Sequence, residues 1–172
     1  MAKKVLGTLS IKNIPLMTLR EQCLVDMSEI IIELSKQFKK GCLNTPFFKD
    51  IPCMNNDELN LLFHFMKCVS NRETLRGKNK PSWQDDDLHD IPNTESYQQN
   101  NIWHYHCGPY AESTIFNPMR DLKINLNGET SGPVIHYQKI TDNHILIIAF
   151  SPNHEPFPRA WDTPNPIIDR TE

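Results

Sequence analysis

The chain has 172 residues, a formal net charge of −3 and a hydrophobic content of 38%. This length supports one sizeable core and does not require a second domain. The composition is that of an ordinary globular protein rather than a disordered one. The slightly negative charge argues against a protein that coats nucleic acid with its whole surface, although it leaves room for a local basic patch. The longest apolar run, Ile145 to Phe150, is far too short to cross a membrane.

Cysteine usage and the first residues indicate the cellular compartment. The basic residues of Met1–Lys4 are followed by no long apolar stretch with a small-residue cleavage site, so no signal peptide is predicted. The five cysteines are odd in number and form no Cys-x-x-Cys pair, a usage typical of reduced thiols. We therefore expect a cytoplasmic protein with free thiols and no membrane partner.

The first part of the chain, residues 1–70, is predicted to be mainly helical. Thr18–Lys40 begins with a capping-box pattern and ends before Gly41, a natural helix stop. Its apolar residues recur at helical spacing: Leu24, Met27, Ile31, Leu34 and Phe38. A second helix is predicted over Asp57–Val69. Its apolar stripe consists of Leu59, Leu62, Phe63, Met66 and Val69. Both stripes indicate packing against a core.

The middle of the chain, residues 71–101, is predicted to be a polar insertion or loop, because its polarity is high and apolar periodicity is absent. Its stretch "RETLRGKNK" is basic, and the stretch "DDDLHD" that follows closely is acidic. This segregation could serve a polyanion contact and a basic partner, respectively, or be an ordinary solvated loop.

After Asn101 the apolar pattern changes to the two-residue period of β-strands. Strands are predicted over Ile102–Cys107, Val134–Thr141 and His144–Phe150, and the last two form a hairpin. The prolines of the following stretch predict an extended tail over residues 159–172. Helices followed by strands predict an α+β fold, in which N-terminal helices pack on a small antiparallel sheet. Residues 1–172 then form a single domain, with the sheet and the candidate site in residues 102–158.

The stretch "IWHYHCGPY" raises the question of function. Side chains alternate along a strand, so His104 and His106 share one face with Ile102, while the aromatic residues share the other. His136, Tyr137 and Lys139 lie on the next predicted strand, and His154 lies just beyond the last one. The sequence therefore groups several polar side chains in the sheet half of the chain.

Three interpretations of this group are open. The His-x-His strand could present two imidazoles to a zinc ion, with His136 or His154 as a third ligand. The imidazoles could instead serve general acid–base cleavage of RNA, because a pKa near 6.5 makes both protonation states accessible. Each histidine could also be half-buried and hydrogen-bonded to the backbone, without a chemical role.

The stretches "IWHYHCGPY" and "VIHYQKITDNHILIIAFSPNHEP" resemble the YafO-type toxins of bacterial toxin–antitoxin modules. The resemblance covers roughly residues 28–158 and is interrupted over residues 57–95. It implies a RelE-like fold and a toxin that acts as an mRNA endonuclease, ribosome-dependent in this family, with a protein antitoxin as partner. By position, the family's site residues correspond to His104, His106, Tyr137, Asp142 and His154.

Together these arguments predict an endoribonuclease that cleaves mRNA by histidine-based acid–base chemistry without a metal or other cofactor. The predicted catalytic residues are His104, His106, His136, Tyr137 and His154. The predicted substrate-binding residues are Arg72, Arg76, Lys78, Lys80 and Lys139. A zinc hydrolase that uses the His-x-His strand and a non-catalytic partner-binding protein are the alternatives.

Overall fold

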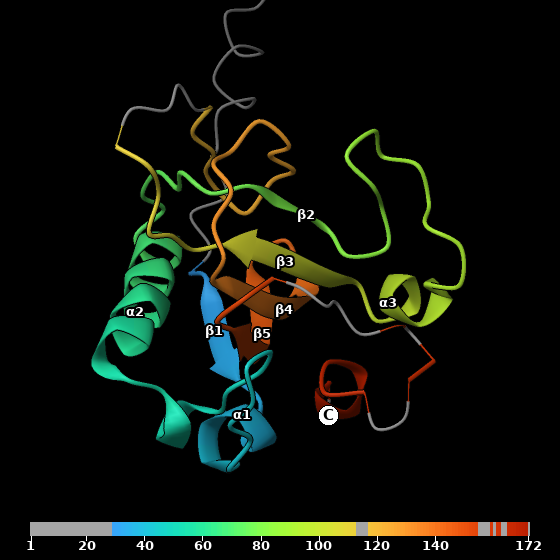
Figure 1. Ribbon diagram of the computed structural model, residues 1–172. Coiled ribbons are helices and arrows are strands. Elements are labelled where there is room, and N and C mark those ends of the chain that lie inside the picture. Colours follow the sequence, from blue (N-terminus) through green and yellow to red (C-terminus); the bar gives the residue numbers. More distant parts are fainter. Residues whose placement is uncertain (1–28, 113–116, 155–158, 160, 163–164, 172) are drawn as a thin grey trace, which may run out of the picture.

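The computed structural model describes residues 29–112, 117–154, 159, 161–162 and 165–171 (Figure 1). The described helices and strands are, in chain order, β1 (Ile31–Leu34), α1 (Lys36–Lys40), α2 (Asn56–Ser70), β2 (Asn79–Pro81), α3 (Glu95–Gln99), β3 (Ile102–His106), β4 (Val134–Thr141) and β5 (His144–Ser151). Two short 3₁₀ turns, η1 (Ile51–Cys53) and η2 (Ile168–Arg170), complete the set. The strands form one five-stranded sheet in the order β1-β5-β4-β3-β2. The fold is therefore α+β, as predicted.

The three strands predicted from alternation are present. β3 pairs antiparallel with β4, and β4 with β5, so the predicted hairpin lies in the middle of the sheet. β5 is buried at nearly every position, because it lies between two other strands and is covered on both faces.

The helix predicted over Thr18–Lys40 is confirmed only over its last residues, Lys36–Lys40, which form α1 and end before Gly41. Its residues before position 29 lie outside the described residues. Ile31–Leu34 is not helical but forms β1, which pairs parallel with β5, starting from Ile31 opposite His144. The run of β-branched isoleucines favours a strand, and the edge of β5 provides the main-chain partners for it. The sheet is consequently mixed rather than purely antiparallel.

The second predicted helix is confirmed as α2. Asn55 is its N-cap and forms a capping box with Glu58. The helix buries Leu62, Phe65 and other side chains against the sheet, whereas Phe63 is exposed. The buried stripe is therefore rotated relative to the predicted one.

The middle segment was predicted to be a polar insertion or loop, but it also contributes β2 and α3. β2 adds an edge strand to β3 through the pairs Asn79–Tyr105 and Pro81–Trp103. α3 buries Tyr97. Polar composition concealed these elements, because an edge strand of three residues carries no readable alternation.

The two faces of the sheet are covered by different elements. α2 packs on one face, where its buried side chains join Trp103, Tyr105 and Tyr137 in the main apolar cluster. On the other face a smaller cluster gathers Ile102 with apolar side chains from α3, β5 and η2. In Figure 1, α2 and α3 accordingly stand on opposite sides of the strands. The smaller cluster leaves part of the second face to polar side chains.

The C-terminal tail is anchored by a buried ion pair. Arg170 in η2 lies 2.5 Å from Asp50, and their side chains are 10% and 1% exposed. The same carboxylate accepts a 2.7 Å hydrogen bond from the backbone N–H of Leu43. This pair fixes residues 165–171 beside the segment between α1 and α2.

The described cysteines and helices bear on two further predictions, the free thiols and the absence of a membrane span. Cys42, Cys53, Cys68 and Cys107 are free thiols, and Cys23 lies outside the described residues. Within the described ranges, no helix has both the length and the apolar character that a membrane span requires.

Candidate functional site

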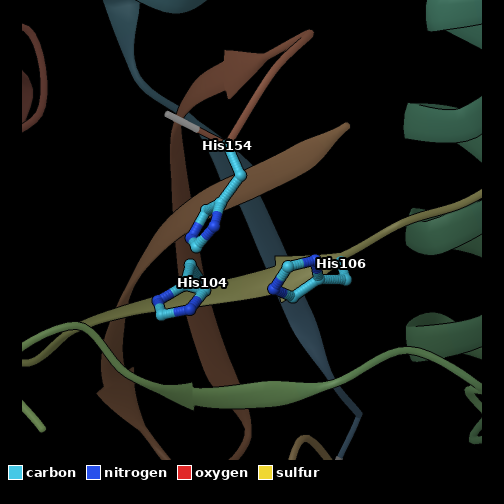
Figure 2. A group of neighbouring side chains, drawn as sticks. All are labelled: His104, His106 and His154. Atoms are coloured by element: carbon cyan, nitrogen blue, oxygen red, sulfur yellow. The ribbon is translucent and has the colours of Figure 1, made fainter. Parts of the chain in front are cut away.

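The candidate site lies on the sheet face that α2 does not cover. His104 and His106 occupy alternate positions of β3, so that both imidazoles project from this face. His104 is paired with His136 on β4 and with Lys80 on β2. Figure 2 shows His154 reaching the two β3 histidines from the segment after β5. Three strands and one connection thus bring together residues that are far apart in the sequence.

His104, His106 and His154 form one compact group, which we call the histidine cluster. One ring nitrogen of each lies within 4.8 Å of those of the other two. The ring centroids are 5.8 Å apart for His104–His106, 5.2 Å for His104–His154 and 4.8 Å for His106–His154. His104 and His106 are each 4% exposed, and His154 is half-buried. A single small group can therefore contact all three imidazoles.

Two serines orient the imidazoles of β3. Nδ1 of His104 lies 3.1 Å from the hydroxyl of Ser82, just after β2. Nδ1 of His106 lies 2.9 Å from the carbonyl oxygen of Ser131 and 3.0 Å from its backbone nitrogen. When Nδ1 donates to these oxygens, the lone pair is on Nε2. Because Ser131 also offers a donor, both neutral tautomers of His106 are accommodated.

A cleft of about 520 Å³ opens over the histidine cluster. Lys78 and Lys80, which we call the lysine pair, line this cleft with side chains that are 11% and 12% exposed. Their Nζ atoms lie 2.5 Å and 2.7 Å from the two carboxylate oxygens of Asp86. The rest of the lining consists of the histidine cluster with Thr130, Ser131 and Gly132. The cleft thus joins titratable imidazoles to a group that binds anions.

A second cavity, of about 390 Å³, adjoins the first and shares His104, His154 and Lys80 with it. Its other lining residues include the apolar or aromatic side chains Ile91, Pro92, Tyr97 and Trp161 and the amides Gln84 and Asn93. This cavity can accept a flat, partly apolar group next to the histidine cluster.

Burial keeps the imidazoles of His104, His106 and His136 neutral. It lowers the pKa of His106 to about 4 and the pKa of His104 well below its usual value, and the charges of neighbouring histidines add to both effects. Burial also lowers the pKa of His136 to about 3. Neutral imidazoles are proton acceptors and metal ligands.

Protein stability is expected to fall in acid because of His136. This side chain is 0% exposed and its Nε2 lies 2.7 Å from the Ser151 hydroxyl. The pKa of His136 is lower in the folded chain than in the unfolded chain, so below pH 6.5 the unfolded chain binds more protons and stability falls with pH until about pH 3. The contribution of His136 to the free energy of unfolding is about 2 kcal/mol less at pH 5 than at pH 8.

Urea denaturation at both pH values, on the wild type and on His136→Gln, measures this contribution. Glutamine is uncharged at both pH values, and its amide can still meet Ser151. The variant should therefore lose less stability than the wild type between pH 8 and pH 5. Equal losses would contradict the prediction.

Two predicted site residues lie on the wrong face. Tyr137 pairs with Trp103 and is fully buried in the main apolar cluster, where its hydroxyl donates to Asn79 Oδ1 at 2.9 Å. Lys139 lies over the ring of Trp103, with Nζ 4.9 Å from the centroid, and 3.5 Å from the exposed Asp142. Strand alternation places both residues opposite to the histidine cluster, so Tyr137 and Lys139 cannot act with it.

The predicted basic residues divide into two groups. Lys78 and Lys80 line the cleft, as described. Arg72 pairs with Asp121 at 2.6 Å, and Arg76 pairs with Glu129 at 2.6 Å. Neither arginine is among the described residues that line the two cavities. The sequence could not separate these groups, because the acidic partners of the arginines, Asp121 and Glu129, lie about 50 residues farther along the chain.

Sequence reasoning missed the residues that complete the site. Ser82 and Ser131 orient the imidazoles, but a serine in a loop carries no signal that identifies its partner. Asp86 belongs to the acidic stretch "DDDLHD", which the sequence analysis related to a basic partner. In the structure, Asp86 binds the lysine pair of the same chain.

The site allows two kinds of chemistry. Its neutral imidazoles can exchange protons with a substrate whose charge is held by the lysine pair. The three ring nitrogens can also converge on one metal ion, with the ring N–H groups of His104 and His106 donated to Ser82 and Ser131, a typical support for histidine ligands.

No protein-family model, curated protein or solved structure matches the chain.

Proposed function

We propose that the protein is an endoribonuclease that cleaves RNA through the histidine cluster. The observation that carries this proposal is the convergence of three imidazoles in a cleft that also contains the lysine pair. Cleavage of RNA needs a proton acceptor for the ribose 2′-hydroxyl, a proton donor for the departing 5′-oxygen, and positive charge near the phosphate. The cleft provides side chains for all three tasks.

The reaction proceeds by transfer within the RNA strand. A neutral imidazole of β3, from His104 or His106, takes the 2′-hydroxyl proton, and the 2′-oxygen forms a bond to phosphorus. The bond to the 5′-oxygen breaks, and a protonated imidazole gives that oxygen its proton. The products are a 2′,3′-cyclic phosphate and a 5′-hydroxyl. His154 is the least buried of the three and suits the donor role, because it exchanges protons with solvent more readily.

The phosphate of the substrate favours the protonated imidazole that this mechanism needs. In the protein alone, burial holds the pKa of His106 at about 4. A phosphate beside the imidazoles adds negative charge, which favours their protonated forms and raises their pKa values toward neutrality. The cluster is thereby prepared for acid–base work when an RNA phosphate occupies the cleft.

The adjoining cavity suits the base of a nucleotide at the cleavage site. Trp161 offers exposed aromatic surface, and Gln84 and Asn93 offer amides for hydrogen bonds. Because this cavity shares His104 and His154 with the cleft, a base in it and a phosphate in the cleft can belong to one nucleotide.

Cleavage of a short RNA and of the same strand with a single 2′-deoxy substitution at each position tests this function. Each reaction is run with and without ribosomes, and with and without a chelator. The proposal requires cleavage that the chelator leaves unchanged, a cyclic phosphate product, and no cleavage at the deoxy position. Cleavage of the deoxy strand at the same place would overturn it.

A zinc-dependent hydrolase is the second candidate. It is favoured by the distance of 4.8 Å or less between the ring nitrogens of the histidine cluster, from which small rotations of the side chains would bring all three within reach of one zinc ion. In that case His104, His106 and His154 would hold the metal, which would activate a water molecule. Metal analysis of protein purified without a histidine tag, together with loss of activity on chelation, would support this candidate and exclude the first.

We further propose that the nuclease is a cytoplasmic toxin of a toxin–antitoxin module that acts on mRNA, ribosome-dependent as in the YafO-type family. The support is the resemblance of the His-x-His strand and of the segment that ends in His154 to that family. Induced expression should arrest growth, and co-expression of the protein encoded by the adjacent gene should relieve the arrest. Normal growth during induced expression of folded protein would contradict this role.

A further inference from the structure

In the protein alone, both ammonium groups of the lysine pair already contact an anionic side chain. Both Nζ atoms contact the carboxylate of Asp86, at 2.5 Å and 2.7 Å. The two lysine side chains are nearly buried, whereas the side chain of Asp86 is 65% exposed. The lysines hold the pKa of Asp86 at about 2, so its carboxylate is an anion under all physiological conditions.

This carboxylate occupies the position where the proposed function needs a phosphate. Lys80 is paired with His104 across β2 and β3, and the backbone N–H of His106 donates to the carbonyl oxygen of Lys78. The lysine pair therefore lies directly beside the histidine cluster, in the same cleft. A phosphate offers the same kind of oxygen acceptors as a carboxylate, with greater charge.

We infer that Asp86 is an intramolecular competitor that occupies the phosphate subsite of the cleft until substrate displaces it. The identification of the phosphate as part of RNA rests on the proposed function. The competition itself rests only on the contacts of Asp86 with the lysine pair. The acidic loop then regulates the affinity of the cleft for anions.

The loop can release Asp86 without losing its own structure. Asp85 Oδ1 accepts hydrogen bonds of 2.9 Å from the backbone N–H groups of Asp87 and His89. The ends of the loop are joined by a 3.1 Å bond from Gln84 to Asp90. These bonds do not involve Asp86, so its side chain can turn into solvent while the loop stays folded.

The expected effect follows from the occupancy of the subsite. Apparent affinity is reduced in proportion to the fraction of molecules that are competent to bind, so if Asp86 fills the subsite about 90% of the time, its removal strengthens phosphate binding about tenfold. Asp86→Asn keeps the size of the side chain and removes its charge. Asp87→Asn, at an exposed neighbouring position, is the matched control.

Titration of the full chain with inorganic phosphate, followed by NMR, tests the inference. Binding should be about tenfold tighter in Asp86→Asn than in the wild type, unchanged in Asp87→Asn, and lost in Lys80→Met. In the wild type, phosphate should also shift the amide signal of Asp86 itself as its side chain leaves the lysine pair. Equal or weaker binding in Asp86→Asn would overturn the inference, as would binding that survives in Lys80→Met.

This titration separates the inference from the proposed function, because it does not require any RNA cleavage. If Asp86→Asn binds phosphate more tightly but the wild type cleaves no RNA, the competition stands and the nuclease proposal fails. If RNA is cleaved through the histidine cluster but Asp86→Asn leaves phosphate binding unchanged, only the competition fails.

Discussion

Alanine at His106 is expected to reduce RNA cleavage by about 10²–10⁴-fold, the usual effect of removing one group that transfers a proton in the transition state. A reduction in the same range is expected for His154→Ala, which removes the proposed proton donor, and the larger of the losses in His104→Ala and His106→Ala identifies the proton acceptor, because the ring nitrogens of all three lie within 4.8 Å of one another. The measurement is the single-turnover rate of cleavage of a short RNA at saturating protein, so that weaker binding does not contribute.

The control for this prediction must separate chemistry from folding. His106 is nearly buried and holds Ser131 through Nδ1, and His106→Asn can keep a hydrogen bond to Ser131 while it removes the nitrogen that faces the cluster. His64→Ala and His89→Ala change exposed histidines of α2 and of the acidic loop and should cleave like the wild type. A folded His106→Asn variant with normal activity would contradict the proposed role.

The largest expected effect on stability concerns Arg170. Arg170→Met is expected to lower the free energy of unfolding by about 3–5 kcal/mol, the typical cost of breaking a buried ion pair. The carboxylate of Asp50 is 1% exposed and would remain buried without its cationic partner. Methionine is chosen because it keeps much of the apolar stem of arginine, so that the loss reports charge rather than packing.

The matched control is Arg72→Met, which removes an arginine from an ion pair whose side chains are 33% and 38% exposed. Exposed pairs of this kind typically contribute about 0–1 kcal/mol. Urea denaturation of both variants measures the difference. If Arg170→Met cost no more than Arg72→Met, burial of the Asp50 pair would not have the predicted consequence.

The acid–base and metal candidates make opposite demands on the same imidazoles. A metal needs all three to stay deprotonated, whereas the acid–base mechanism needs one of them protonated in the complex with substrate. Burial favours the neutral form in the protein alone. The lysine pair favours an anion in the cleft, and the anion reverses this preference. The effect of a chelator on RNA cleavage therefore distinguishes the two chemistries directly.

The sequence by itself determined the parts of the molecule that depend on local periodicity. The alternation in Ile102–His106 correctly separated the histidine face from the aromatic face, because the side chains of a strand have no other way to point. The hairpin of β4 and β5 and the helix α2 were likewise readable, since each has a clear period and turn or cap residues at its ends.

The tertiary structure decided everything that depends on partners distant in the chain. Ile31–Leu34 is a strand because β5 offers it an edge, although its apolar residues also fit a helix. Tyr137 is excluded from the site because the register of β3 and β4 pairs it with Trp103 and not with His104. The lysine pair meets the histidine cluster only through β2. Pairing and register are properties of the whole sheet, and no stretch of sequence contains them.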